Sequence, residues 1–363
     1  MTPLIGKRFG VARIFTAAEI VAEELPPVKW VVPDILPEGV TFLAGKPKMG
    51  KSWMGLDLSI ATATGGVALG TKRVERGEVL CLALEDNKRR IQNRLTKLLA
   101  GRPAPASLHI TTEWPRLDEG GADLLGDWLA IHPAARLVIV DTLAMFKPHA
   151  SGRRSAYDED REAVAPLGPI AADHGVAILL VHHLRETESD DPLDMITGSV
   201  GLTGGVDGAL VLKRQRGRAD AFLHVEGRDI ENPTELALKL DPNAATWAIV
   251  GDAEEYRLSE QRSALLRVLL NADEPLGPKE LAEMTDAKYG ATRELLSRMA
   301  KDGQVKNLGR GQYVHPDNLQ NNADNADILT NGRGDVSLSG MSGHFRKEPS
   351  GGISVNEQGE AEF

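Results

Sequence analysis

The sequence predicts an α/β protein with a mostly parallel sheet, followed by a winged helix-turn-helix. From residue 40 to about 250, short apolar runs alternate with amphipathic helical patterns, which is typical of a parallel sheet with helices on both faces. Beyond this region the pattern changes to three short helical segments and a Gly-rich strand pair. We therefore expect a lead-in at 1–35, an α/β core at 36–252, a winged helix at 257–316 and a disordered, Asn-, Gly- and Ser-rich tail at 317–363.

The strands of the core are expected where apolar, β-favouring residues cluster. These runs read VTFLA (40–44), EVLCLAL (78–84), RLVIV (136–140), VAILLV (176–181), GALVLKR (208–214) and AFLHVEG (221–227). Helical spacing is found after the first strand, over 87–100 and over about 155–174. The last two strands are close in sequence, so we expect them to form an antiparallel hairpin at one edge of the sheet.

A phosphate-binding loop is expected between the first strand and the first helix. The residues in order are Gly45, Lys46, Pro47, Lys48, Met49, Gly50, Lys51 and Ser52, which fit G-x-x-x-x-G-K-[ST]. The glycines allow backbone N–H groups to turn toward an anion, Lys51 can reach the outer phosphates of a nucleotide, and the Ser52 hydroxyl can bind Mg²⁺. A chance match in a Gly-rich chain is the alternative, but the strand before the loop and the helix after it favour the functional interpretation.

Two carboxylates that follow apolar strands are candidates for the same site. Asp141 comes directly after RLVIV, where a second Mg²⁺ ligand is expected, although an Asp can also simply end a strand. Thr142 follows it, so the residue that polarises water must come from elsewhere. We expect Glu85, at the end of VLCLALED, to do so, because ligands bind at the carboxyl ends of strands in open α/β sheets. The alternative for Glu85 is a charge near a helix N-terminus, and Asp86 is expected to cap that helix.

The ordered series GKPKMGKS, LALED, LVIVDTLA, ILLVHHLRE, GSVGLTGGVDGALVLKR and VEGRD resembles the RecA-fold P-loop ATPases of the RepA and DnaB type. These include plasmid and phage AAA ATPases and hexameric replicative helicases, and the resemblance covers residues 30–250. It implies ATP and Mg²⁺ as ligands, a homo-oligomer such as a hexamer, and DNA as a partner.

The resemblance also implies two roles for polar residues at later strand ends. His183, beside His182, would occupy the position of a γ-phosphate sensor, and an imidazole can donate a hydrogen bond to a phosphate oxygen. The alternative is a His pair that ends a strand. Arg228 would be an arginine finger that reaches a neighbouring subunit's nucleotide. Lys213 and Arg214 are alternatives for this finger, and an exposed arginine can also be merely solvated.

Basic residues that could contact DNA occur in two places. Lys147, Arg153 and Arg154 lie in FKPHASGRRSAYDED, a loop that suits sequence-independent contacts with phosphates, although it could also be an ordinary charged surface loop. The second core loop, RETESDDPLDMIT, is acidic and would repel a strand. In the winged helix the second helix would enter the major groove, presenting Arg293 and Arg298, with Lys288 and Thr292 beside them and Lys306 and Arg310 in the wing.

Composition excludes several protein classes. A net charge of −10 argues against a wholly basic nucleic-acid-binding surface. The single cysteine, Cys81, lies in an apolar run and is expected to be buried and unpaired. No apolar run of 18 residues predicts a membrane span, and no signal-peptide core is seen, so a cytoplasmic protein is expected.

Three functions fit these observations. The first is a DNA-dependent Mg²⁺-ATPase of the RepA helicase type that acts in phage or plasmid DNA replication or recombination. The second is an ATP-switched regulator that binds duplex DNA through its winged helix without translocating. The third is a P-loop enzyme that does not act on DNA, such as a small-molecule kinase, for which no acceptor-binding region is apparent.

Overall fold

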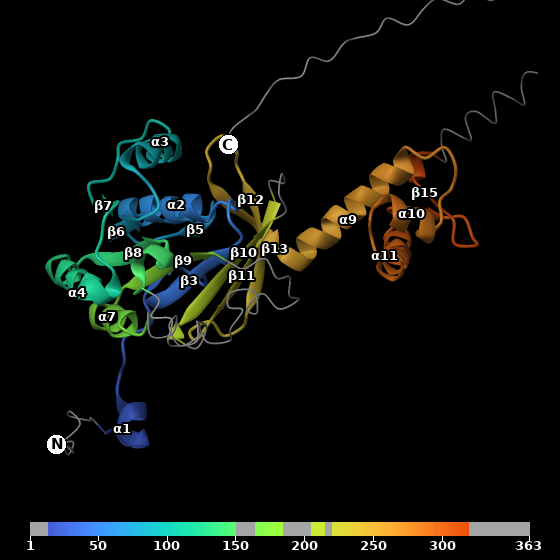
Figure 1. The fold of residues 1–363 in the computed structure, drawn as a ribbon. Coiled ribbons are helices and arrows are strands. Elements are labelled where there is room, and N and C mark those ends of the chain that lie inside the picture. The colour runs from blue at the N-terminus through green and yellow to red at the C-terminus, as the bar shows by residue number, and fades with distance from the viewer. Residues whose placement is uncertain (1–13, 150–163, 184–204, 215–219, 319–363) are drawn as a thin grey trace, which may run out of the picture. The chain divides into compact units, whose positions relative to one another are not determined.

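A computed structural model describes residues 14–149, 164–183, 205–214 and 220–318 of the chain. The chain divides into two units, residues 1–260 and 261–363. The first unit contains a sheet of nine described strands in the order β13-β12-β11-β10-β3-β9-β8-β6-β7 (Figure 1). Each strand from β10 to β7 in this order runs parallel to its neighbour, whereas β11, β12 and β13 are added antiparallel. The predicted mixed α/β core with a large central sheet is therefore confirmed.

The parallel strands have the following bounds. They are β3 (Gly39–Gly45), β6 (Glu78–Ala83), β7 (Leu108–Thr111), β8 (Ala135–Asp141), β9 (Ala177–His183) and β10 (Gly208–Arg214). The antiparallel strands are β11 (Asp220–Gly227), β12 (Thr234–Leu240) and β13 (Trp247–Asp252). The expected late hairpin is thus present as β10 and β11, and three further strands, β7, β12 and β13, were not expected from the sequence.

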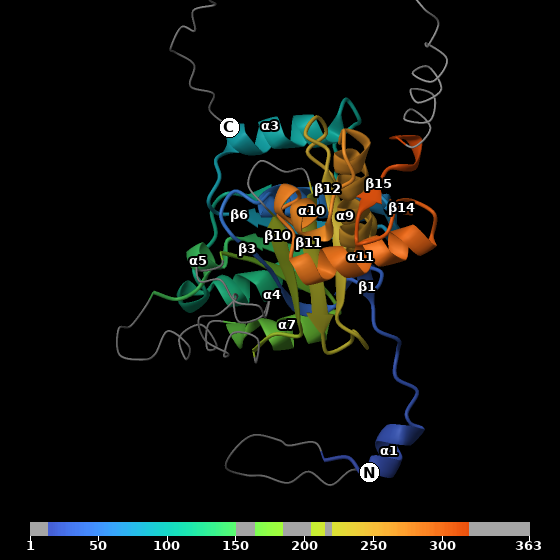
Figure 2. The same cartoon turned by 90° about the vertical axis from the view of Figure 1, so that its right-hand side faces the viewer.

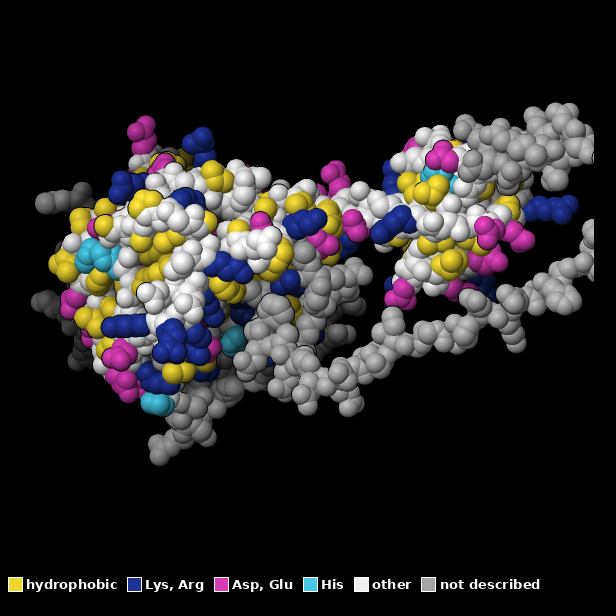
Figure 3. Space-filling view, turned by 90° about the horizontal axis from the view of Figure 1, so that it is seen from above, with side chains coloured by type: hydrophobic (Ala, Val, Ile, Leu, Met, Phe, Trp, Pro, Cys, Tyr) yellow, Lys and Arg dark blue, Asp and Glu magenta, His cyan; other side chains and the backbone are white. Residues whose placement is uncertain are grey.

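Helices cover both faces of this sheet. On one face lie α2 (Lys51–Thr64) and α3 (Lys88–Leu99), and on the other lie α4 (Gly121–Ile131), α5 (Leu143–Phe146) and α7 (Leu167–His174) (Figures 1 and 2). Lys and Arg side chains gather on the face of the core that is seen from above (Figure 3), and α3 itself carries five such residues. Small additional elements are α1 (Ala17–Ala22), the 3₁₀ helix η1 (Leu117–Glu119) and the strand pairs β1 (Trp30–Val32) with β2 (Leu36–Pro37) and β4 (Val67–Ala68) with β5 (Lys72–Arg73).

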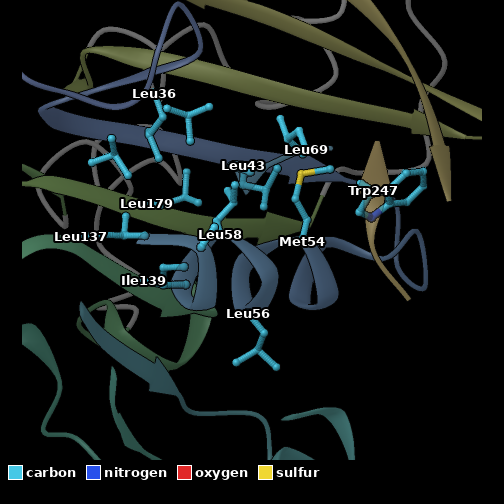
Figure 4. Packing of buried hydrophobic residues seen from close by; sticks show 14 of the residues in the cluster. Leu36, Leu43, Met54, Leu56, Leu58, Leu69, Leu137, Ile139, Leu179 and Trp247 are labelled. Atoms are coloured by element: carbon cyan, nitrogen blue, oxygen red, sulfur yellow. The ribbon is translucent and has the colours of Figure 1, made fainter. Parts of the chain in front are cut away.

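The core consists of two hydrophobic layers, one on each side of the sheet. Successive strand residues point to opposite faces. In β3, Leu43 joins the layer under α2 and α3, whereas Phe42 and Ala44 join the layer under α4 and α7. Figure 4 shows the first layer, in which Met54 and Leu58 of α2 pack on the strands. Burial on both faces explains why these strands appear in the sequence as continuous apolar runs.

Cys81 lies in this core with only 2% of its surface exposed and forms no disulfide, as predicted. Burial raises the pKa of its thiol to about 12. Among the described residues, no helix combines the length and apolar character that a membrane span requires.

The second unit is built on helices followed by a short strand pair. Helix α9 (Ala253–Leu270) runs through the expected boundary between core and winged helix, and is followed by α10 (Pro278–Met284) and α11 (Tyr289–Lys301). Strands β14 (Lys306–Asn307) and β15 (Tyr313–Val314) pair antiparallel. Buried Leu281, Leu296 and Met299 join α10 and α11 in a small core. The expected tail, 317–363, lies outside the described residues from residue 319 onward.

Candidate functional site

The phosphate loop (Gly45–Ser52) lies between the end of β3 and the start of α2. Gly50 is the N-cap of α2 and has a φ of 98°, a left-handed conformation that favours glycine. Gly65, also left-handed, ends the same helix. The strand and helix that the motif requires on its two sides are therefore both present, and the N-terminus of α2 supplies unpaired backbone N–H groups for an anion.

The strand register brings the predicted polar residues to one edge of the sheet. Gly45 of β3 is paired with His183 of β9, and Ala83 of β6 is paired with Asp141 of β8. Glu85 follows β6 by two residues, and its backbone N–H donates to the Asp141 carbonyl over 3.3 Å. Because the strands are parallel, their carboxyl ends all reach the edge at which the phosphate loop begins.

Lys51 is the buried cation of this site. Only 4% of its surface is exposed, and its Nζ donates to the backbone carbonyls of Gly45 (2.7 Å) and Lys46 (3.0 Å). Burial lowers the pKa of Lys51 to about 8, although the nearby Asp141 and Glu85 carboxylates act in the opposite direction. An ammonium group has three donors. A phosphate that binds Lys51 must therefore replace one of its present partners.

The third partner of Lys51 is His183. Its Nδ1 lies 3.2 Å from Lys51 Nζ, while its Nε2 lies 3.8 Å from Glu85 Oε2. If Lys51 donates to Nδ1, the imidazole carries its proton on Nε2, on the side of Glu85. His183 thus lies between the cation for the phosphates and the carboxylate predicted to orient water. Its neighbour His182 instead packs against Phe42, with ring centroids 5.9 Å apart.

Glu85 is held by the residue that follows Asp141. The Thr142 hydroxyl donates to Glu85 Oε1 over 2.6 Å, and Thr142 itself is 1% exposed. The Asp141–Thr142 peptide bond is cis. A hydroxyl that donates to a carboxylate fixes its direction and leaves the second oxygen of Glu85 open. The sequence identified Thr142 only as the absence of an acid, and missed this positioning contact.

Asp141 and Ser52 form the candidate Mg²⁺ site. Burial raises the pKa of Asp141, and a hydrogen bond with the Ser52 side chain acts against this rise. Among the other charges, Glu85 and Asp86 raise the pKa further and Arg94 lowers it. A cavity of about 10 Å³ lies beside Ser52, Asp86 and Asp141, which is room for one water-sized group.

Asp86 is not the cap that the sequence suggested for α3. The N-cap is Asn87, whose side chain accepts from the Arg90 N–H over 3.0 Å. Asp86 is instead 8% exposed, and pairs with Arg90 Nε at 2.7 Å and with Arg94. An Asp paired with two arginines beside the Asp141 carboxylate is a functional feature that sequence reasoning missed, because the pairing depends on the direction of α3.

Arg228 lies at the opposite edge of the sheet from the phosphate loop. Strand β11 runs antiparallel to β10, and Gly208 at the start of β10 is paired with Gly227. The Arg228 guanidinium donates to Asp207 Oδ1 over 3.1 Å and is 66% exposed. The structure therefore does not bring Arg228 to the site within one chain. Its expected role toward a neighbouring subunit stays a prediction.

The alternative cations, Lys213 and Arg214, lie at the edge that carries the site. Leu212 of β10 is paired with Gly45, so both residues follow directly beyond the start of the phosphate loop. The Arg214 guanidinium lies 5.4 Å from the centroid of the Trp247 ring.

The residues predicted to contact DNA are only partly described. Lys147 is half-buried and follows α5, and its carbonyl accepts from Arg116 over 2.6 Å. Arg153, Arg154 and the acidic loop at 185–197 lie outside the described residues.

On α11, the residues predicted to contact DNA differ in orientation. Arg293 and Arg298 are exposed, and Arg298 pairs with Glu294. Thr292, expected to face DNA, is 3% exposed and its hydroxyl donates to the Lys288 carbonyl. It therefore packs inside the small unit, and this expectation was wrong.

Comparisons with known proteins agree with the geometry. Residues 10–189 match the family model described as an AAA domain. The search of the curated proteins finds no match.

Similar solved structures include the ATPase domain of another protein (12% identity, 58% of this chain, 84% of that chain, TM-score 0.45). A DnaB-like replicative helicase, in a structure that concerns its interactions with primase, is 13% identical over 58% of this chain and 57% of that chain, with a TM-score of 0.45. The RadB recombinase is 14% identical over 60% of this chain and 92% of that chain, with a TM-score of 0.43.

Proposed function

Because residues 10–189 match the AAA-domain family and the chain is a RecA-fold P-loop ATPase of the DnaB and RepA type, we propose that it is an Mg²⁺-dependent ATPase whose turnover is stimulated by DNA. The observation that carries the proposal is the assembly of Lys51, Ser52, Glu85, Asp141 and His183 at one edge of the sheet. These residues come from four separate segments of the chain.

Each of these side chains has a distinct part in the proposed reaction. Lys51 holds the outer phosphates of ATP and stabilises the negative charge that develops on them. Glu85, directed by Thr142, accepts a hydrogen bond from the attacking water and orients it. His183 lies within reach of both and donates to the γ-phosphate, so that its position differs before and after phosphate release.

Ser52 and Asp141 are the residues that would hold Mg²⁺. A hydroxyl bonded to a buried carboxylate is a hard oxygen pair of the kind that this ion prefers. No group of three or more His, Cys, Asp or Glu side chains that could bind a metal is found in the described part of the chain. This fits an ion held jointly by protein and substrate phosphates. When bound, Mg²⁺ neutralises charge on the phosphates.

DNA as the activating partner, and a ring of identical subunits, are proposed from the family type. Support within the chain comes from the second unit, where α10, α11 and the β14–β15 pair follow one another in the order of a winged helix-turn-helix. Exposed Arg293 lies on α11, and exposed Lys306 and Arg310 lie in the strand pair and its turn. The same residues support a second candidate, an ATP-switched regulator that binds duplex DNA without translocating.

Steady-state ATP hydrolysis, measured alone and with single- or double-stranded DNA, tests the proposal. We expect Mg²⁺-dependent turnover that single strands stimulate and that high salt suppresses, because phosphate contacts are weakened by salt. Glu85→Gln should bind ATP with unchanged affinity but hydrolyse it about 100-fold or more slowly. Duplex binding without stimulation of turnover would favour the regulator. Wild-type turnover by Glu85→Gln would refute the assignment of the site.

A further inference from the structure

We infer that Trp247, on the outermost strand of the sheet, is a positioning residue for the phosphate loop and couples that loop to the Arg214 end of β10. The inference rests on the proposed ATPase function and adds to it a residue that lies about 200 positions from the motif in the sequence. Three contacts of one buried indole carry it.

The first observation is that β13 lies far from the phosphate loop within the sheet but touches it in space. Four strand-to-strand steps separate β13 from β3 in the sheet order. Neighbouring strands are about 4.8 Å apart, so a flat sheet would hold the two strands on the order of 19 Å apart. The antiparallel extension must therefore curve over the start of α2. A hydrogen bond from the Ile249 N–H to the Leu69 carbonyl, 2.9 Å long, holds β13 in this place.

The second observation is the contact between Trp247 and Gly50. The indole is 1% exposed, and its Nε1 donates to the Gly50 carbonyl over 3.4 Å. A Cβ at Gly50 would lie only 3.0 Å from Trp247 Cζ2, so the ring packs directly on the glycine backbone. Figure 4 shows the ring beside the first turn of α2, close to Met54. Gly50 immediately precedes Lys51, so the indole supports the residue that sets where the cation begins.

The third observation is the guanidinium of Arg214 over the same ring, 5.4 Å from its centroid. Arg214 ends β10 two residues beyond Leu212, which is paired with Gly45 at the other end of the phosphate loop. The indole thus contacts the loop through Gly50 and contacts the end of β10 through Arg214. A cation over an indole face is held by the ring quadrupole, and this attraction strengthens when water is excluded.

A buried Trp that served packing alone would not need its N–H directed at the loop. Burial of an indole N–H without a partner is unfavourable, and the acceptor available here is the carbonyl of the loop's last glycine. The same carbonyl also accepts from the Met54 N–H over 3.0 Å, in the first turn of α2. Trp247 therefore acts on the join between the loop and the helix, and movement of either partner alters its contacts.

The test compares Trp247→Phe with Trp114→Phe in the full chain. Trp114 provides the matched control, because its Nε1 also donates to a glycine carbonyl, that of Gly121 at 3.1 Å, away from the site. We expect Trp247→Phe to raise the KM for ATP about three- to tenfold while kcat changes less than twofold, as loss of one positioning hydrogen bond predicts. Trp114→Phe should leave both constants unchanged.

A second variant keeps the test decisive if Trp247→Phe folds poorly. Arg214→Met removes the cation from the ring without altering the core, and should also raise the KM for ATP. Nucleotide binding should change the tryptophan fluorescence of the wild type, and this change should be reduced in Arg214→Met.

The outcomes separate the inference from the proposed function. Unchanged KM in both Trp247→Phe and Arg214→Met, with only a lower melting temperature, would overturn the positioning role. A fall in kcat alone for Arg214→Met would assign that residue to the reaction itself and also overturn the coupling. A wild-type protein that neither binds nor hydrolyses ATP would instead refute the proposed function.

Discussion

Lys51 is predicted to reduce the stability of the nucleotide-free protein. Burial lowers its pKa from the ordinary 10.5 to about 8. One pKa unit is worth about 1.4 kcal/mol, so keeping Lys51 charged in the folded state at neutral pH costs on the order of 3 kcal/mol. Lys51→Met retains the length of the side chain and removes the charge. We expect this variant to be about 1–3 kcal/mol more stable than the wild type at pH 7, since lost hydrogen bonds to Gly45 and Lys46 offset part of the gain.

The pH dependence gives this prediction its sign. Between about pH 8 and 10.5 the unfolded chain keeps a proton on Lys51 that the folded protein has released. Wild-type stability therefore rises with pH in this window relative to Lys51→Met, and the advantage of the variant shrinks.

Urea unfolding without nucleotide, at pH 7 and pH 9.5, measures both effects. Lys48→Met, at an exposed lysine in the same loop, is the control and should change little. A Lys51→Met protein that is less stable than the wild type at pH 7, or a stability difference that is equal at both pH values, would refute the reasoning.

Two further predictions concern the carboxylates of the site. Thr142→Val removes the hydroxyl that directs Glu85 and should lower kcat about 10-fold or more with little change in KM, measured as phosphate release. A parallel rise in KM would show that the hydroxyl has a different role. Arg94→Gln removes a charge that lowers the pKa of Asp141, so the Mg²⁺ concentration for half-maximal activity should rise, and more at pH 6 than at pH 8. Equal effects at the two pH values would contradict this account.

The central sheet and most of the candidate site could be predicted because they follow local rules. Each parallel strand is buried on both faces, so it appears as a continuous apolar run, and the polar residue just after the run falls at the carboxyl edge. Glu85, Asp141 and His183 were identified in this way. The phosphate loop was identified because its glycines have a backbone role that few other residues can fill.

The parts that were missed depend on chain direction and on long-range packing. Arg228 follows an apolar strand just as Asp141 does, but β11 is antiparallel, so the end of this strand lies at the far edge of the sheet. Asp86 and Asn87 are both good caps, and only the course of α3 decides between them. The contact of Trp247 with Gly50 requires the curvature of the sheet, which no pattern in the sequence records.

The way in which β13 ends the sheet has a consequence for aggregation. A bare edge strand offers a row of backbone donors and acceptors that can template pairing with another chain. At β13 the outer side is occupied in part by the Ile249–Leu69 hydrogen bond, and a register shift interrupts its pairing with β12 between Ala237 and Leu238. At the other end of the sheet, β7 is only four residues long. The folded core therefore resists strand-to-strand association at both ends, which leaves assembly to side chains and loops that can be specific for a partner.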